Sequence, residues 1–457
     1  DRHAGPPAYE ATATLRPSHV RHRVLGMLFL LSIITYVDRV CIGSAAPLMR
    51  RDLGLTPLQM GLVFSAFSWA YGIFEIPSGW MGDRFGPRKM LTRIVVWWSA
   101  FTALTGRVSS FYSLWITRFL FGAGEAGAYP NSACAIARWF PFVERARAQG
   151  MVWMASRLGG ALAPLLVVPL QRELGWRNVF YLFGGIGVIW GVAWYLWYRD
   201  YPDQKAGVNA AEIQIIREGA PPPKAHVATP WRTVLTSGNM WAVVMMYFTY
   251  GYGVQFYFFW MPSYLVEVRG IQNFAPYASL PFLLGAFANA FGGWSSDALV
   301  RRLGLCWARR AVGLIGLGGS VALVLLSLLI PSQLSFPLSL PAFLVGQSGF
   351  RLVGLDVPLA VLALALAFAS TDFMLPNCWA VCLDIGKRHS GTVTGFMNTA
   401  AQIGGAIAAI LIGYFAGRKQ WNTAIATMAV MLLISASLYL VIDASRPLVR
   451  EDEAASA

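Results

Sequence analysis

The chain alternates between long apolar stretches and short polar loops. A helix that crosses a hydrocarbon core of ~30 Å at ~1.5 Å per residue needs about 20 residues. Applying this rule predicts twelve membrane-spanning helices, at 23–48, 59–81, 91–109, 112–136, 147–170, 177–198, 239–265, 274–298, 310–330, 354–383, 391–416 and 421–442. The pattern therefore predicts an all-α integral membrane protein.

One long polar connection, 199–238, separates the predicted helices into two sets of six. It contains three successive prolines at 221–223 and charges of both signs, which is typical of a linker, and 211–218 within it could form a short amphipathic helix. We therefore expect five parts: a cytoplasmic N-terminal tail (1–22), an N-terminal six-helix bundle (23–198), a cytoplasmic linker (199–238), a C-terminal six-helix bundle (239–442) and a cytoplasmic C-terminal tail (443–457).

The two sets of helices repeat three motifs in the same order. GWMGD at 79–83 matches GWSSD at 293–297, Pro-Asn at 130–131 matches Pro-Asn at 376–377, and GMVWMASRLGGALA from 150 matches GFMNTAAQIGGAIA from 395. Matches between equivalent helices indicate an internal duplication. The sequence thus predicts two pseudo-symmetric bundles, and its small-residue steps predict close helix packing.

Composition limits the possible functions. Of 457 residues, 56% are hydrophobic and 13% are charged, and the formal net charge is +14. Most Lys and Arg residues of the predicted loops fall on one side of the membrane if both termini are cytoplasmic, as the positive-inside rule requires, so this charge does not indicate nucleic-acid binding. The five Cys and five His residues form no metal-binding spacing, and all the His residues lie in tails or loops. We expect a multi-pass protein of the inner (plasma) membrane, without metal or cofactor.

Charged residues inside the predicted spans are the strongest functional signal. Asp38 and Arg39 lie in the middle of the first span, where a lipid-facing charge costs about 2.5–3.5 kcal/mol. Arg118 and Glu125 are seven residues apart and so share one face of the fourth span, and Arg157 lies in the fifth. These residues predict a polar pathway inside the bundle. Alternatively, they only neutralise one another as structural ion pairs, and Glu75 and Asp372 could then supply the balance.

The loop after the second span reads GWMGDRFGPRK, from Gly79 to Lys89, and resembles the cytoplasmic signature of the major facilitator superfamily. Its carboxylate can meet a helix N-terminus and nearby Arg groups, which predicts a conformational latch made of Gly79, Asp83, Arg84, Gly86 and Arg88. Further stretches, YVDRVCIGSAAP, RFLFGAGEAGAYPN, WFPFVERARAQG and FFWMPSYLVEVRG, narrow the resemblance to the anion:cation symporter family. The resemblance covers about 23–442 and implies the fold of that superfamily.

The resemblance also implies roles for individual residues. It implies proton coupling by Asp38, Arg118 and Glu125, and binding of an anionic substrate by Arg39 together with Glu125. Arg157 departs from the neutral amide expected in sugar-acid transporters. We include it among the further candidates for substrate binding, which are Tyr36, Tyr71, Arg157, Gln255, Trp260, Trp379, Asn398 and Gln402.

The expected function is import of a small organic anion, such as a sugar acid, together with protons by alternating access. We expect a monomer in the lipid bilayer that binds the anion and H⁺ and no nucleic acid. An exporter or antiporter of amphiphilic compounds is the alternative, although three intramembrane Arg residues favour an anion. An enzyme is the least expected class, because no loop carries a metal constellation, a phosphate-binding glycine loop or a nucleophile with a His partner.

Overall fold

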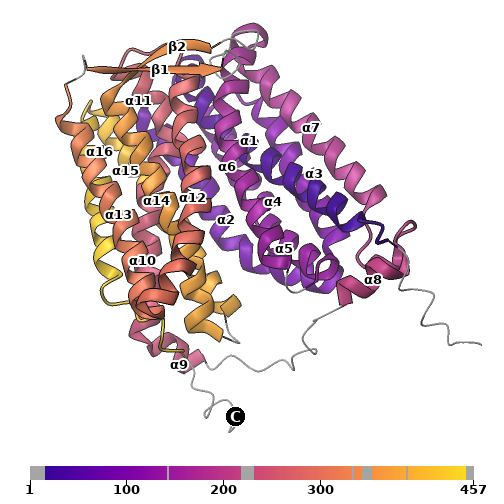
Figure 1. The fold of residues 1–457 in the computed structure, drawn as a ribbon. Coiled ribbons are helices and arrows are strands. Elements are labelled where there is room, and N and C mark those ends of the chain that lie inside the picture. Colours follow the sequence, from indigo (N-terminus) through magenta and orange to yellow (C-terminus); the bar gives the residue numbers. More distant parts are fainter. Residues whose placement is uncertain are drawn as a thin grey trace, which may run out of the picture.

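The computed structural model describes residues 16–141, 144–217, 231–331, 334–341, 352–387 and 390–448. Helices account for nearly all of its regular structure (Figure 1). In chain order the elements are α1 (Val20–Leu53), α2 (Pro57–Phe85), α3 (Pro87–Thr105), α4 (Phe111–Glu125), α5 (Ala128–Trp139), α6 (Arg145–Leu174), α7 (Trp176–Trp197), η3 (Pro202–Gln204), α8 (Ala210–Arg217), α9 (Trp231–Thr236), α10 (Gly238–Gln255), η4 (Phe256–Trp260), α11 (Met261–Glu267), α12 (Ala275–Leu303), α13 (Leu305–Leu329), β1 (Ser335–Pro341), β2 (Leu352–Pro358), α14 (Leu359–Gly386), α15 (Ser390–Gly417) and α16 (Trp421–Leu438).

The helices form two bundles, α1–α7 and α10–α16, which account for the twelve predicted spans in the described residues. The bundles meet mainly where α2 packs on α15 and α6 packs on α12. The predicted repeat is visible in the packing: a Cβ on Gly79 would lie 3.5 Å from Pro130, and one on the equivalent Gly293 would lie 3.6 Å from Pro376. Equivalent residues therefore make equivalent contacts in the two halves.

Two predicted spans are not continuous α-helices. The fourth divides into α4 and α5 at Gly127, whose φ of 92° is accessible to glycine and strained for other residues. The seventh consists of α10, the π-helical segment η4 and α11. The helices α4 and α5 have 15 and 12 residues, too short to cross a membrane alone, and seven other helices of the described chain are long and apolar enough to do so.

The segment after α13 differs from the sequence prediction. Residues predicted to begin the tenth helix at 354 instead belong to β2, which pairs antiparallel with β1, from Ser335 opposite Pro358 to Pro341 opposite Leu352. The backbone carbonyl of Asp356 accepts a hydrogen bond from Tyr277 on α12. The hairpin lies at one end of the bundles and α8 and α9 lie at the other, which we call the hairpin end and the linker end (Figure 1).

The predicted linker helix is present as α8 and attaches to the start of α1. The buried carboxylate of Glu212 accepts hydrogen bonds from the backbone N–H groups of Val20 and Arg21, each at 3.0 Å, and from the Ser18 hydroxyl. Glu212 therefore satisfies N–H groups at the first turn of α1 that have no partner within the helix. Of the predicted linker, 218–230 lie outside the described residues, as do 1–15 and 449–457 of the predicted tails.

Candidate functional site

A cavity of about 660 Å³ lies between the two bundles. Its lining runs along α2 from Phe67 to Gly79 and along α15 from Gln402 to Ser390. In both helices the residues nearest the linker end are Gly79 and Ser390, and those at middle depth are Phe67 and Gln402. The cavity is therefore open toward the linker end and closed toward the hairpin end.

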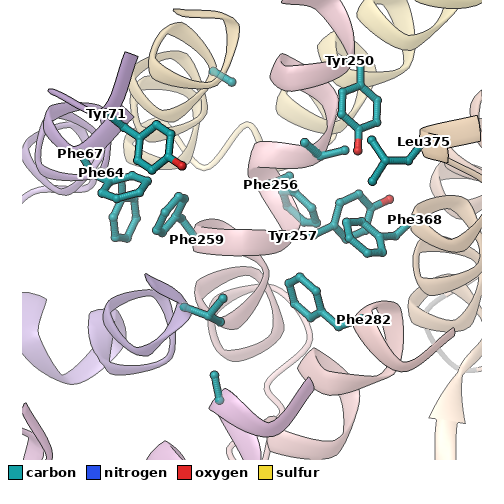
Figure 2. Close-up of a cluster of buried hydrophobic side chains, with 14 of the residues drawn as sticks. Phe64, Phe67, Tyr71, Tyr250, Phe256, Tyr257, Phe259, Phe282, Phe368 and Leu375 are labelled. Carbon is teal, nitrogen blue, oxygen red and sulfur yellow. The ribbon is translucent and has the colours of Figure 1, made fainter. Parts of the chain in front are cut away.

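Aromatic side chains close the cavity toward the hairpin end. Figure 2 shows Phe64 and Phe259 on one side of this closure and Phe282 and Phe368 on the other. The rings of Phe64 and Phe259 stack at 4.9 Å, and those of Phe282 and Phe368 meet edge to face at 5.1 Å. Beyond these rings the two bundles pack backbone against backbone, because a Cβ on Gly61 of α2 would clash with the carbonyl oxygen of Ala409 on α15.

Arg39 is the cation that the cavity presents most openly. Its guanidinium lies 4.9, 5.0 and 5.1 Å from the ring centres of Tyr36, Phe67 and Tyr71. Its Nε donates to Oε1 of Glu125 at 3.0 Å, and its Nη2 donates to the same oxygen. Glu125 is fully buried at the last position of α4, directly before the break at Gly127. The rings orient the guanidinium by cation–π contact, and the pairing occupies only one carboxylate oxygen.

Asp38 and Arg118 do not line the cavity but lie behind its wall, and both are buried. The carboxylate of Asp38 accepts a hydrogen bond of 3.1 Å from the indole of Trp98, and its other oxygen has no hydrogen-bond partner in the described part of the chain. The guanidinium of Arg118 lies 4.0 Å from the ring centre of Phe121 and makes no hydrogen bond to any described residue. Asp38 and Arg118 thus do not pair with each other in this conformation.

Arg157 on α6 forms a buried ion pair with Asp372 on α14. Its Nε donates to Oδ2 at 2.6 Å and its Nη2 donates to Oδ1 at 2.8 Å, while Nη1 lies 3.4 Å from the hydroxyl of Tyr36. This two-point pair joins the two bundles. It also balances the positive charge of Arg157, and Asp372 is one of the two acids that the sequence analysis named as able to supply this balance.

Most of the other predicted substrate-binding residues line the cavity. These are Tyr36, Tyr71, Gln255, Trp379, Asn398 and Gln402. Trp260 does not line it: this side chain is fully buried nearer the hairpin end, where its indole donates to the carbonyl of Ala409 at 3.2 Å. On α10 and η4, Tyr250, Val254 and Phe258 line the cavity and are spaced four residues apart, so they share one face of the span. Trp260 does not lie on that face.

The cavity also contains residues that we did not assign to substrate binding. Glu75 accepts hydrogen bonds from the Asn398 amide, with Nδ2 at 2.6 Å from each carboxylate oxygen, and so joins α2 to α15. Tyr129 stacks on Trp153 at 4.5 Å, and Trp153 lies 5.6 Å from Trp379 of the other bundle. The position of Tyr129, four residues after Glu125 and directly before the repeated Pro-Asn, could have identified it.

The predicted latch residues lie at the linker end. A Cβ on Gly86 would lie 2.6 Å from the carboxylate of Asp200, which accepts a hydrogen bond of 2.9 Å from the backbone N–H of Arg88. The exposed Arg84 lies against the rings of Trp80 and Phe85, and Gly79 packs on Pro130 of α5. These contacts lie within the N-terminal bundle. The side chain of Asp83 lies outside the described part of the structure.

Comparisons with known proteins agree with this architecture. Residues 28–367 match the Major Facilitator Superfamily. The crystal structure of a bacterial homologue of the human lysosomal transporter Spinster, inward-facing and unoccupied, superposes with a TM-score of 0.70 at 19% identity, covering 93% of this chain and 97% of that one.

Several sequences are similar over nearly their whole length. The probable sulfoacetate transporter of Cupriavidus necator is 36% identical, covering 87% of this chain and 88% of its own. The probable galactarate/D-glucarate transporter of Escherichia coli is 30% identical (94% and 95%), and the hexuronate transporter of Bacillus subtilis is 30% identical (92% and 93%). Two helical bundles around a central charged cavity and these whole-length matches lead to one assignment: the chain is a multi-pass membrane transporter, not an enzyme, and belongs to the anion:cation symporter family of the Major Facilitator Superfamily.

Proposed function

We propose that this transporter imports a small organic anion, such as a sugar acid or another short carboxylate or sulfonate, together with protons. The observation that carries the proposal is Arg39, a cation held in the cavity wall by three aromatic rings and paired with one oxygen of Glu125. Such a group can exchange its carboxylate partner for an anionic substrate. The substrates for which these relatives are named, sulfoacetate, galactarate or D-glucarate and hexuronate, support the same class of cargo.

The rest of the lining suits a polar anion. Gln255, Asn398 and Gln402 offer amides, and Tyr36 and Tyr71 offer hydroxyls and flat ring faces. A volume of about 660 Å³ is within the range of ~300–1,000 Å³ typical of small-molecule sites. In the proposal, Arg39 binds the anionic end of the substrate and the amides and hydroxyls bind its hydroxylated part.

In the proposal, proton coupling depends on two buried carboxylates, Glu125 and Asp38. Protonation of Glu125 releases Arg39 for the substrate and gives the neutral acid a hydrogen to donate. Asp38 is the principal coupling group: it binds Arg118 in one conformation and carries a proton in another. One proton with a monoanion gives electroneutral uptake, and two protons make the uptake electrogenic. The inward-negative potential then contributes ~2.3 kcal/mol per positive charge per 100 mV.

The orientation of the transporter in the membrane follows from the distribution of its basic residues. Arg84 in the last turn of α2 and Arg88 and Lys89 in the first turn of α3 lie at the linker end, which the positive-inside rule assigns to the cytoplasm together with both termini. The cavity then opens inward in this conformation, and the hairpin end faces outward. The opposite conformation opens the hairpin end while the linker end closes through the latch loop.

Uptake into proteoliposomes tests this proposal. Labelled gluconate, glucarate, glucuronate and sulfoacetate would be offered with an inward proton gradient or with the gradient collapsed. We expect the gradient to drive accumulation of at least one acid, and we expect Asp38→Asn to abolish this accumulation. Equal accumulation with and without the gradient would remove the proton mechanism. Absence of uptake of every acid would favour the exporter of amphiphilic compounds.

A further inference from the structure

The ion pair between Arg157 and Asp372 lies at the closed end of the cavity. Arg157 lines the cavity, with Trp153 and Gln149 one and two turns closer to the linker end on the same helix. Asp372 lies about one turn beyond Leu375, which also lines the cavity. The ring of Phe368, part of the aromatic closure, is centred 5.7 Å from the Arg157 guanidinium. The pair therefore belongs both to the cavity wall and to the closure.

Its two partners belong to different bundles, so the pair depends on conformation. Alternating access in this fold moves one bundle against the other. Opening the hairpin end separates α6 from α12, against which α14 also packs, and a Cβ on Gly285 of α12 would lie 2.5 Å from Oδ2 of Asp372. The two-point pair between Arg157 and Asp372 cannot be kept when these helices separate.

A broken pair leaves two charged groups that need new partners, because an isolated buried charge is strongly unfavourable. Few ionisable groups of the described chain face Asp372: Arg157 from α6, Tyr36 from α1 through Arg157, and Tyr250 from α10. Tyr257 of η4 packs on Phe368, one turn away from Asp372 on α14. None of these supplies a second cation for Asp372 or a carboxylate for Arg157. A proton can neutralise Asp372, and an anion entering from outside can neutralise Arg157.

We propose that Arg157 is a second anion-binding group, made available when the hairpin end opens, and that it selects substrates carrying two anionic groups. The inference rests on the proposed function and specifies its substrate class. One anionic group binds Arg39 and the other replaces Asp372 on Arg157. Asp372 meanwhile takes a proton from the outer solution and releases it inside when the pair forms again. The second negative charge of the substrate thus enters with a proton of its own.

Pairs of substrates that differ by one anionic group test the contribution of Arg157. Glucarate and gluconate differ at one terminal carbon, a carboxylate in the first and a hydroxymethyl group in the second, and sulfoacetate and isethionate differ in the same way. The full-length transporter and its Arg157→Gln/Asp372→Asn double variant would be compared in proteoliposomes. The double variant removes both charges, so neither is left buried without a partner. Arg177→Gln/Asp52→Asn is the control, since it removes an exposed ion pair away from the cavity.

We expect the double variant to raise the ratio of the KM for glucarate to the KM for gluconate about tenfold or more, the usual effect of losing a hydrogen bond to a charged group. The control should leave this ratio unchanged. An unchanged ratio in the double variant, or a wild-type protein that carries gluconate and rejects both dianions, would overturn the inference while leaving anion import intact. Failure to carry any of the four acids would instead refute the proposed function.

Proton counting gives a second readout that a purely structural ion pair would not change. The number of protons carried with each glucarate can be measured from the potential at which net flux reverses. We expect Asp372→Asn to lower this number by one. The same proton number for glucarate in wild type and variant would contradict the exchange at Asp372.

Discussion

Arg39 donates two hydrogen bonds to a single oxygen of Glu125, and the other oxygen, Oε2, has no hydrogen-bond partner in the described part of the chain. The carboxylate is fully buried, so half of its accepting capacity is unused in a region without bulk water. A proton on the unpaired oxygen would weaken the ion pair and leave the hydrogen-bond geometry of Oε1 in place. This relationship gives the first prediction.

Glu125→Gln mimics the protonated acid. We expect this variant to bind and exchange substrate across the membrane, because Arg39 is no longer held by a carboxylate, and to lose accumulation driven by a proton gradient. Counterflow of labelled substrate, compared with gradient-driven uptake in the same proteoliposomes, separates the two activities. Gradient-driven accumulation at the wild-type level would exclude Glu125 from coupling.

Arg39→Lys keeps the positive charge and loses the planar group that lies over the rings of Tyr36, Phe67 and Tyr71. We expect the KM for the anion to rise about ten- to a hundredfold, as for loss of a charge-assisted hydrogen bond. Concentration-dependent uptake measures this effect. Arg107→Lys is a suitable control, because Arg107 is exposed just after α3 and belongs neither to the cavity lining nor to the latch. An unchanged KM in Arg39→Lys would show that charge alone is sufficient.

Gly61→Val should prevent closure of the hairpin end. The added Cβ would clash with the carbonyl oxygen of Ala409 and approach the Cα of Ile410 at 3.3 Å, so closing α2 on α15 would cost about 1–3 kcal/mol more. We expect a population shifted toward the conformation open at the hairpin end. In a variant whose five cysteines are replaced, a cysteine at position 64 should react faster with a membrane-impermeant reagent added outside.

The matched control for this substitution is Gly26→Val, since an added Cβ at Gly26 would have no atom within 4 Å. It introduces the same side chain into a membrane helix without touching the closure. Equal labelling rates in Gly61→Val and Gly26→Val would show that the close approach of α2 and α15 does not control the closed state.

The docking of α8 on α1 should depend on pH through Glu212. Burial opposes ionisation of this carboxyl group, but hydrogen bonds from Ser18, Arg21 and Val20, together with the charge of Arg21, outweigh it and lower the pKa of Glu212 below its ordinary 4.5. A lowered folded-state pKa means that the stabilisation is complete above the ordinary pKa and is lost as pH falls through the folded pKa. We expect amide exchange in the first turn of α1 to accelerate over that acidic range.

Glu212→Gln should remove this pH dependence and lower the free energy of local opening by about 1–2 kcal/mol at neutral pH. Hydrogen-exchange mass spectrometry of peptides covering Val20 and Arg21 measures both effects. Glu267→Gln is the control: Glu267 pairs with Arg50 at the opposite, hairpin end of α1, and its loss should leave exchange at the first turn of α1 unchanged. Identical pH profiles for wild type and Glu212→Gln would show that another group holds α8.

Much of the architecture could be predicted from the sequence, because membrane-spanning helices are specified locally by length and hydropathy. The repeated Pro-Asn and glycine motifs also predicted the equivalence of the two bundles, which is visible in the contacts of Gly79 with Pro130 and Gly293 with Pro376. The break after Glu125 was missed, because nothing in the sequence distinguishes Gly127, which has a positive φ, from the many other glycines. The β1–β2 hairpin was missed because its residues are as apolar as those of a membrane-spanning helix.

The site was predictable where it depended on local motifs and not where it depended on distant pairs. The positions of Arg39 and Glu125 follow from charges within apolar spans, and the structure brings these two residues together. The partner of Arg157 lies 215 positions away in the other bundle, and Glu75 meets Asn398 across 323 positions. Hydrophobic periodicity carries no information about such pairs. Trp260 was predicted to face the cavity, and in this conformation it does not line it.

The π-helical segment η4 has a consequence for how the seventh span can vary. A π-turn holds more residues than an α-turn, so losing one residue between Phe256 and Trp260 can restore an ordinary α-turn. The same loss inside α10 would rotate every later side chain by about 100° around the helix axis. Gln255, which lines the cavity, and Trp260, which packs beyond it, therefore lie on two helical segments whose registers are separately adjustable. Substitutions around Gln255 can therefore change substrate preference while the packing of Trp260 beyond the cavity stays the same.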